Sequence, residues 1–116
     1  MSNAHLDSAV LATLQDVMES EYPVLLDTFL ADSEERVRLL KQACQAAEAD
    51  MLRQAAHSFK GSCSNMGATL LAELCRELED LARREQLAQA PVLIESIERE
   101  FAIIGILFRA ERQRLG

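Results

Sequence analysis

The sequence predicts an all-α protein, an antiparallel up-down four-helix bundle with a short additional N-terminal helix. Apolar residues make up 49% of the chain but aromatic residues only 4%, so the expected core is aliphatic. Val and Ile are few, and Pro and Gly together number six, which argues against a β-sheet. Apolar residues also recur at spacings of three and four, which is the spacing of the seams between bundled helices.

Five helices are expected in a single domain spanning residues 1–116, at approximately 7–20, 22–48, 50–66, 68–86 and 91–114. Asp7 is placed to cap the first helix. Its expected apolar residues are Val10, Leu11, Leu14, Val17 and Met18. Pro23 then opens the second helix, because the first turn tolerates proline. We interpret the charge run from Asp32 to Arg36 as a solvent-exposed face with ion pairs along the helix.

The third helix is expected to start at Asp50, a good N-cap residue, and to end at Asn65 and Gly67. Its apolar arc consists of Leu52, Ala55, Ala56, Phe59, Cys63 and Met66. The connections on both sides of this helix are short, which requires antiparallel neighbours.

The fourth helix has a broad apolar face, and Pro91 opens the last one. The fourth-helix face consists of Leu70, Leu71, Leu74, Cys75, Leu78, Leu81 and Ala82. The last helix has Ile94, Ile97, Phe101, Ile104 and Phe108 at spacings of three and four. Cys44, Cys63 and Cys75 all lie on apolar faces, so we interpret them as small core residues.

A histidine faces solvent on the third helix. At about 100° per residue, His57, Gly61 and Ser64 lie opposite the apolar arc. Lys60 lies on the flank of His57, close enough for its ammonium group to share a ligand with the imidazole. Gly61 removes the side chain beside His57, although glycine inside a helix costs about 1 kcal/mol relative to alanine. The combination indicates a nucleophilic imidazole, a cation for an attached anion, and clearance for a large partner.

The segment His57-Ser-Phe-Lys60-Gly61-Ser62-Cys-Ser-Asn65-Met-Gly67-Ala68, followed by Leu71, Cys75, Leu78 and Glu79, resembles the histidine phosphotransfer (HPt) domain. The resemblance covers approximately residues 20–110, and its specific part is residues 50–79. It implies a four-helix bundle in which His57 is phosphorylated by an aspartate of a response-regulator receiver domain and passes the phosphoryl group to another. It therefore implies a phosphocarrier without kinase activity of its own, whose partners are receiver domains and hybrid sensor kinases.

Glu79 follows His57 by 22 residues across the Gly67 turn, which brings it back to about the height of His57. A carboxylate there can accept a hydrogen bond from one ring nitrogen and leave the other as the nucleophile. HPt relatives often have glutamine at the matching position, so the acid is a small departure. The alternative is an ordinary surface glutamate that pairs with Arg83 or Arg53.

We expect Ser64, Arg53 and Gln54 to support the site or border the partner contact. No metal site is expected on this chain, because no acidic cluster adjoins His57. The Mg²⁺ that phosphoryl transfer normally uses is expected on the receiver domain. No other cofactor is expected.

Two other function classes stay open at this point. An enzyme interpretation makes the chain the dimerisation and phosphoacceptor domain of a sensor kinase. Against it, the chain has no Gly-rich nucleotide-binding segment, and Ser-Phe-Lys follows His57 where such kinases tend to have an acidic residue. It is also compatible with a purely structural adaptor bundle in which His57 is incidental.

Composition narrows the possible partners and location. The net charge of −7 argues against binding to nucleic acid or to an anionic membrane surface. No apolar run approaches the roughly 20 residues of a membrane span. Three cysteines without a recognisable signal peptide favour the reducing cytoplasm. We expect a monomer that acts as a free-standing relay.

Overall fold

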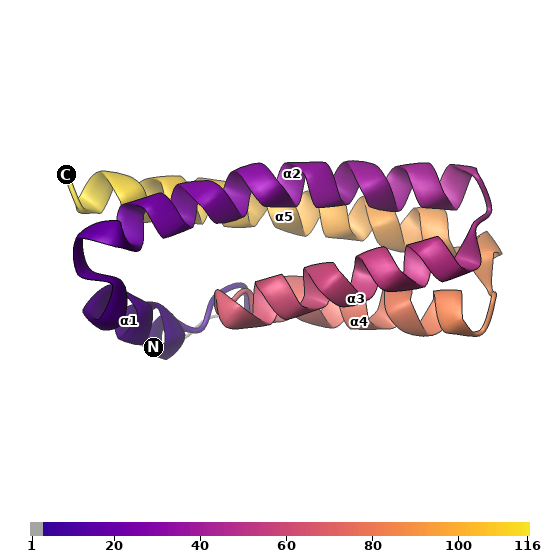
Figure 1. Ribbon diagram of the computed structural model, residues 1–116, viewed down its shortest axis with the longest axis horizontal. Coiled ribbons are helices and arrows are strands. Elements are labelled where there is room, and N and C mark those ends of the chain that lie inside the picture. Colours follow the sequence, from indigo (N-terminus) through magenta and orange to yellow (C-terminus); the bar gives the residue numbers. More distant parts are fainter. Residues whose placement is uncertain (1–3) are drawn as a thin grey trace.

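The computed structural model describes residues 4–116, and they form an all-helical structure without strands (Figure 1). The α-helices are α1 (Ser8–Met18), α2 (Tyr22–Gln45), α3 (Ala49–Asn65), α4 (Thr69–Arg83) and α5 (Ala90–Arg114). Two short 3₁₀ turns, η1 (Glu19–Glu21) and η2 (Leu87–Gln89), precede α2 and α5. The predicted all-α fold is therefore confirmed, with four longer helices in a bundle and α1 added at the N-terminal side.

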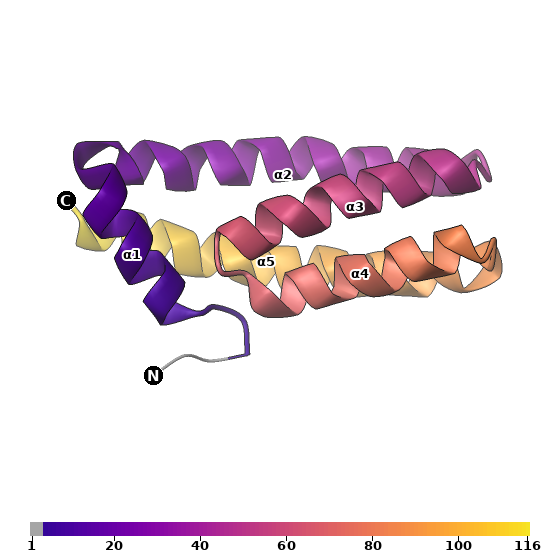
Figure 2. The same ribbon diagram turned by 60° about the horizontal axis from the view of Figure 1, so that its bottom comes forward.

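The four bundle helices run antiparallel to their neighbours, in the ring order α2, α3, α4, α5 (Figures 1 and 2). α1 lies across the end of the bundle where α2 begins and α5 ends (Figure 2). Helix α3 therefore has α2 on one flank and α4 on the other, while its outer face is open. Any functional side chain on that outer face is bordered by residues of α2 and α4.

The core lies along the bundle axis and is almost entirely apolar. Its largest fully buried side chains are Tyr22, Phe59, Phe108, Leu26, Leu40, Leu52, Leu71, Leu78, Ile97 and Ile104. Phe59 on α3 contacts Phe101 on α5 edge to face, with ring centroids 6.5 Å apart. Burying a phenylalanine contributes roughly 1.5–3 kcal/mol, so Phe59 fixes the rotation of α3 and thereby decides which residues face outward.

The N-terminal segment is tied to the bundle through polar contacts. Asp7 caps α1 as predicted, because its side chain accepts a hydrogen bond from the Ala9 amide at 3.0 Å. The Asp7 amide in turn donates to the Gly67 carbonyl at 2.8 Å. His5 Nδ1 lies 2.7 Å from Oε2 of Glu100, a buried carboxylate on α5. These contacts attach the start of the chain to the α3–α4 turn and to α5.

Three helices end earlier than predicted. The expected ranges 7–20, 22–48 and 68–86 each run two or three residues too far at their C-terminal ends. Just beyond each helix the chain reverses through a non-glycine residue in the left-handed region: Glu19 (φ 50°), Ala47 (φ 55°) and Glu85 (φ 58°). The left-handed conformation costs a non-glycine residue about 1–2 kcal/mol. Glutamate and alanine are therefore not residue types from which such a turn is predicted. The α3 end was predicted, because Gly67 supplies the left-handed conformation (φ 72°).

Other local predictions need correction. Helix α3 begins at Ala49 with Glu48 as its N-cap residue, so Asp50 lies in the first turn rather than at the cap. A carboxylate in the first turn is still stabilised by the helix dipole. Val17 was predicted to face the core, but this residue is 72% exposed. Cys44 is only half-buried, whereas Cys63 and Cys75 are buried as predicted.

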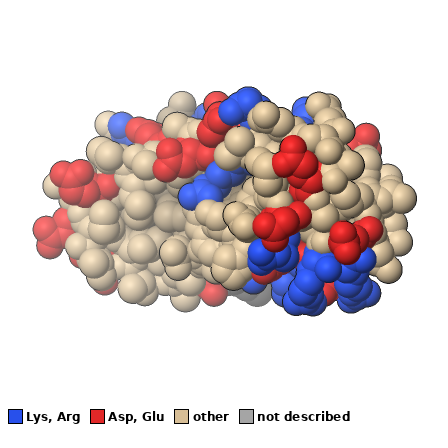
Figure 3. Space-filling view, turned by 45° about the vertical axis from the view of Figure 1, so that its right-hand side comes forward, with Lys and Arg blue, Asp and Glu red and all other residues tan. Residues whose placement is uncertain are grey.

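Within residues 4–116, no helix combines the length and the hydropathy needed to cross a lipid bilayer. Figure 3 shows acidic and basic side chains intermixed in small clusters on one face of the bundle, rather than one continuous basic field.

Candidate functional site

Helix α3 presents His57 to solvent on its outer face. The buried side of the helix consists of Leu52, Ala56, Phe59 and Cys63. His57 lies opposite this stripe, and its side chain is 64% exposed. The predicted exposure of this histidine is therefore confirmed.

Glu79 on α4 orients the imidazole. His57 Nδ1 lies 2.8 Å from Glu79 Oε2, so the predicted contact across the α3–α4 turn is present. Burial raises the pKa of Glu79, but hydrogen bonds from Lys60 and His57 outweigh this effect and hold the pKa below its ordinary value. The carboxylate is therefore ionised at neutral pH and can only accept hydrogen bonds. We infer that Nδ1 carries the proton and donates it, which leaves the lone pair of Nε2 free.

Lys60 shares this carboxylate with His57. Its Nζ donates to Glu79 Oε1 at 2.8 Å, and 30% of the lysine side chain remains exposed. Sequence analysis placed the ammonium group beside the imidazole, and the structure adds that Glu79 bridges the two. The alternative in which Glu79 pairs with Arg53 or Arg83 is wrong, because those arginines pair with Asp50 and Asp80.

Gly61 leaves open space beside His57. A Cβ atom added at this position would have no heavy atom within 4 Å outside the local helix backbone. Helix packing therefore does not require glycine here. The absence of a side chain widens access to the outer face of α3, as the sequence pattern predicted.

The other candidate residues, Ser64, Arg53 and Gln54, make no hydrogen bond to the imidazole of His57 among the described residues. Ser64 is exposed and lines a shallow groove of about 360 Å³ together with Lys60 and the α1 residue Val10. Arg53 and Gln54 both direct their side chains to Asp50, at 2.8 and 2.9 Å, rather than to His57. The structure thus joins His57, Lys60 and Glu79 into one network and leaves Arg53 and Gln54 outside it.

Sequence analysis missed a contact on the other flank of α3. Arg36 on α2 donates through Nη1 to the hydroxyl of Ser58, the residue that follows His57. The charge run that contains Arg36 was interpreted as a set of pairs along one helix. No local pattern indicates that this arginine instead reaches across to α3.

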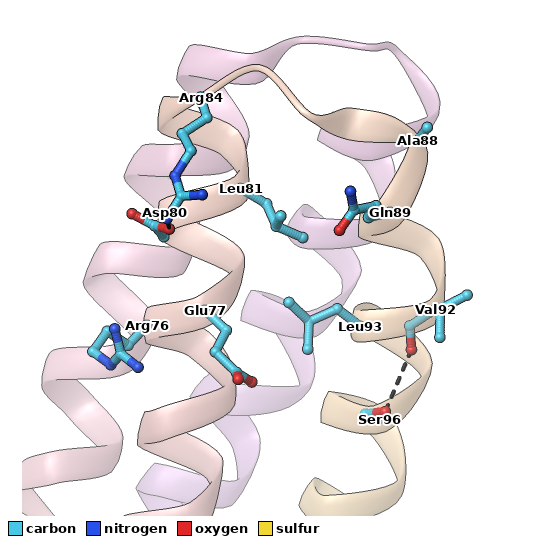
Figure 4. Close-up of a pocket in the computed structure, with 10 residues that line it drawn as sticks. All are labelled: Arg76, Glu77, Asp80, Leu81, Arg84, Ala88, Gln89, Val92, Leu93 and Ser96. Atoms are coloured by element: carbon cyan, nitrogen blue, oxygen red, sulfur yellow. Dashed lines mark hydrogen bonds and ion pairs between the residues drawn. The ribbon is translucent and has the colours of Figure 1, made fainter.

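A larger groove lies elsewhere, between the end of α4 and the start of α5 (Figure 4). It has a volume of about 790 Å³ and an apolar side formed by Leu81, Val92 and Leu93. Its lining also includes Arg84, the residue directly after α4, which pairs with Asp80. This groove does not include any of the three network residues of the His57 site. Among the described residues there is no cluster of His, Cys, Asp and Glu that would hold a metal ion.

The acidity of Glu79 leads to a prediction about stability. A carboxyl group whose pKa is lowered by folding contributes stability above its unfolded pKa, and the contribution is lost as the pH falls through the folded pKa. We therefore expect the parent to be more stable than Glu79→Gln at neutral pH. The difference should shrink as the pH falls below the ordinary range of glutamate. Urea unfolding of both proteins across this range measures the difference, and a gap that widens on acidification would contradict the network.

Comparisons with known proteins agree with this geometry. The model of the Hpt domain family matches residues 24–113. The crystal structure of histidine-containing phosphotransfer protein B (HptB) from Pseudomonas aeruginosa PAO1 is similar over 97% of this chain and 98% of that chain. The two share 65% sequence identity and superpose with a TM-score of 0.95. No curated protein sequence matches the chain.

The match covers all four bundle helices and includes the outer face of α3. It also separates this protein from the sensor-kinase alternative, because Hpt proteins transfer phosphoryl groups without a kinase activity of their own. The chain therefore belongs to the Hpt domain family and is a histidine-containing phosphotransfer protein of a phosphorelay, a phosphocarrier rather than a kinase.

Proposed function

We propose that His57 carries the phosphoryl group, which it accepts from an aspartate of one receiver domain and passes to another. The observation that carries this proposal is the contact between His57 Nδ1 and Glu79, because it leaves Nε2 as the free, outward nucleophile. The exposure of the ring supports a reaction with a group that arrives on another protein.

The proposed step is an in-line displacement at phosphorus. The Nε2 lone pair attacks the phosphorus of an aspartyl phosphate, and an N–P bond forms as the P–O bond to the aspartate breaks. The bonding electron pair leaves with the aspartate, which becomes a free carboxylate. The phosphorylated ring retains its proton on Nδ1, and the negative charge of Glu79 offsets the resulting positive charge on the ring. Transfer to the next receiver is the same step in reverse.

The neighbouring residues assist through charge and space. Lys60 neutralises part of the charge on Glu79 and offers an ammonium group to the phosphoryl oxygens. Gly61 allows the receiver to approach, and Ser64 borders its contact. Arg53 and Gln54 act only indirectly, because Asp50 holds both of them. In this proposal the receiver holds the Mg²⁺ that the transfer uses.

We extend the proposal to partners and location. Receiver domains, including those of hybrid sensor kinases, are the proposed partners of a monomeric chain that binds neither nucleic acid nor membranes. The net charge of −7 supports the proposal that the chain binds neither nucleic acid nor an anionic membrane surface. A cytoplasmic location is supported by three cysteines that are all free thiols.

The test is a transfer assay with a panel of purified receiver domains. Each receiver is phosphorylated with a labelled small-molecule phosphodonor and mixed with the chain, and a parallel sample of the chain receives labelled ATP alone. We expect label to move from at least one receiver to the chain, in a form that is labile to acid as phosphohistidine is. ATP alone should leave the chain unlabelled. An absence of transfer from every receiver would favour the adaptor alternative.

The cation beside the site leads to a further prediction. Lys60→Ala should slow transfer by about 10- to 100-fold, because a charge-assisted hydrogen bond contributes about 1.5–3 kcal/mol. The fold should persist, since Lys60 lies off the buried stripe of α3. Lys41→Ala is the matched control, because it removes a lysine that pairs with Glu98 on α5 at 3.2 Å. Rapid-quench rates that are equal for both variants would remove Lys60 from the mechanism.

A further inference from the structure

An arginine without a carboxylate partner lies on the α2 flank of His57. Arg36 is half-buried between α2 and α3, and its one hydrogen bond within residues 4–116 is the donation to Ser58. Its Nε is buried without an acceptor. The guanidinium is therefore anchored on its inner side by protein contacts, beside the residue that follows His57.

The absence of an ion pair is unusual in this chain. Acidic residues outnumber Lys and Arg by 19 to 12. Among the described residues, only Arg36, Arg99 and Arg109 make no ion pair with a carboxylate. Arg99 and Arg109 lie on α5, which is diagonal to α3 in the bundle. Arg36 is thus the cation that remains unpaired next to the outer face of α3.

The surface next to Arg36 is apolar. Further along the α2–α3 groove, Leu39 on α2 and Met51 on α3 are 40% and 53% exposed. They line a mostly apolar hollow of about 360 Å³ together with Ala43 and Ala55, and Gln42 and Gln54 complete its lining. Apolar surface bordered by a charged rim is the usual anatomy of a protein–protein contact. The flank therefore offers a protein partner an apolar area with one fixed cation at its edge.

We propose that Arg36 is a docking residue that selects receivers with a carboxylate facing the α2 flank of His57, an inference that rests on the proposed function. The planar guanidinium matches a carboxylate in a two-pronged hydrogen-bonded pair. The Ser58 hydroxyl holds the side chain in place before the partner arrives, which lowers the ordering cost of binding.

The geometry favours a contact with the partner over a contact with the phosphoryl group. Glu79 draws the His57 ring toward α4, and Lys60 of α3 extends its ammonium group to the same carboxylate. Arg36 reaches α3 from the opposite flank, through Ser58. We therefore assign the phosphoryl group to Lys60 and the receiver surface to Arg36.

The experiment compares the parent with Arg36→Gln, using a phosphorylated receiver domain that exchanges phosphate with the parent. Single-turnover transfer rates are measured against receiver concentration at low and high salt. We expect the half-saturating receiver concentration of Arg36→Gln to rise about tenfold at low salt, with an unchanged limiting rate. The rise should be smaller at high salt, because the lost contact is electrostatic. The lifetime of the isolated phosphohistidine should not change.

Matched variants separate this role from a loss of net charge or of fold. Arg38→Gln removes the same charge from the opposite side of α2, where Arg38 pairs with Glu35, and its half-saturation should stay within about twofold of the parent. Ser58→Ala leaves Arg36 present but unanchored, so its half-saturation should rise less than that of Arg36→Gln. This variant also serves as the test if thermal unfolding shows that Arg36→Gln is not folded.

Two outcomes would overturn the inference. One is a half-saturating receiver concentration of Arg36→Gln that equals that of the parent. Where Arg36→Gln is not folded, the same result for Ser58→Ala would overturn the inference. The other is a lower limiting rate or a shorter phosphohistidine lifetime at unchanged half-saturation, which would place Arg36 on the phosphoryl group. Failure of the proposed function is distinguishable from both, since the parent itself would then accept phosphate from no receiver.

Discussion

Replacing His57 with glutamine is expected to abolish phosphorylation of the chain by every receiver domain. The substitution removes the Nε2 lone pair, and no neighbouring side chain of the network offers an equivalent nucleophile, because Lys60 is paired with Glu79. The fold should be unaffected, since the His57 side chain is 64% exposed. Transfer of label from a phosphorylated receiver, together with thermal unfolding of the variant, measures both expectations.

His5 provides the matched control, because the chain contains only two histidines. His5 lies beside Glu100 at the N-terminal end of the chain, so His5→Gln should accept phosphate at the parental rate. If a folded His57→Gln variant still accepted label from the receiver, His57 would not be the phosphorylated residue, and another side chain would be the acceptor.

A large side chain at position 61 is expected to slow phosphoryl transfer without lowering the stability of the fold. Gly61→Gln should slow transfer by about 100-fold, because a side chain beside His57 holds the receiver away from Nε2 and small displacements of reacting groups carry penalties of this size. The fold should not be destabilised, since a Cβ at Gly61 meets no heavy atom within 4 Å beyond the local helix backbone. Gly61→Ala should even raise the free energy of unfolding, by about 0.5–1 kcal/mol.

The transfer rate and urea unfolding are measured on the same preparations. Ala102→Gln introduces the same side chain at an exposed position of α5 and should leave transfer unchanged. If Gly61→Gln transferred phosphate at the parental rate, the glycine would not be needed for partner access. Loss of stability in Gly61→Ala would show instead that glycine is required by the helix.

The site could be predicted largely because its geometry lies within one helix and one tight turn. The apolar stripe around Phe59 fixes the rotation of α3, which decides the exposure of His57 and the flank position of Lys60. The Gly67 turn has a clear sequence signal, so the height of Glu79 could be counted across it. Helical periodicity and one glycine thus account for the predicted positions of all three network residues, whereas the bond from Lys60 to Glu79 was not predicted.

The parts that could not be predicted depend on tertiary structure. The helices before Ala47 and Glu85 end in left-handed residues that lack the glycine signal, so the predicted helices ran too long. The contact between Arg36 and Ser58 depends on how α2 and α3 are aligned, which no local pattern contains. Asp50 has the residue type of an N-cap, but the helix starts one residue earlier, and its carboxylate binds Arg53 and Gln54 instead.

The openness of the His57 ring has a consequence for chemical intervention. With 64% of this side chain in contact with water, the chain supplies no enclosing wall for a small molecule to fill. A compound that interrupts signalling at this step must therefore compete for a broad protein surface. In the proposed mechanism, the same openness gives a phosphoryl group on His57 little shelter from hydrolysis, so rapid delivery to the next protein matters more than storage.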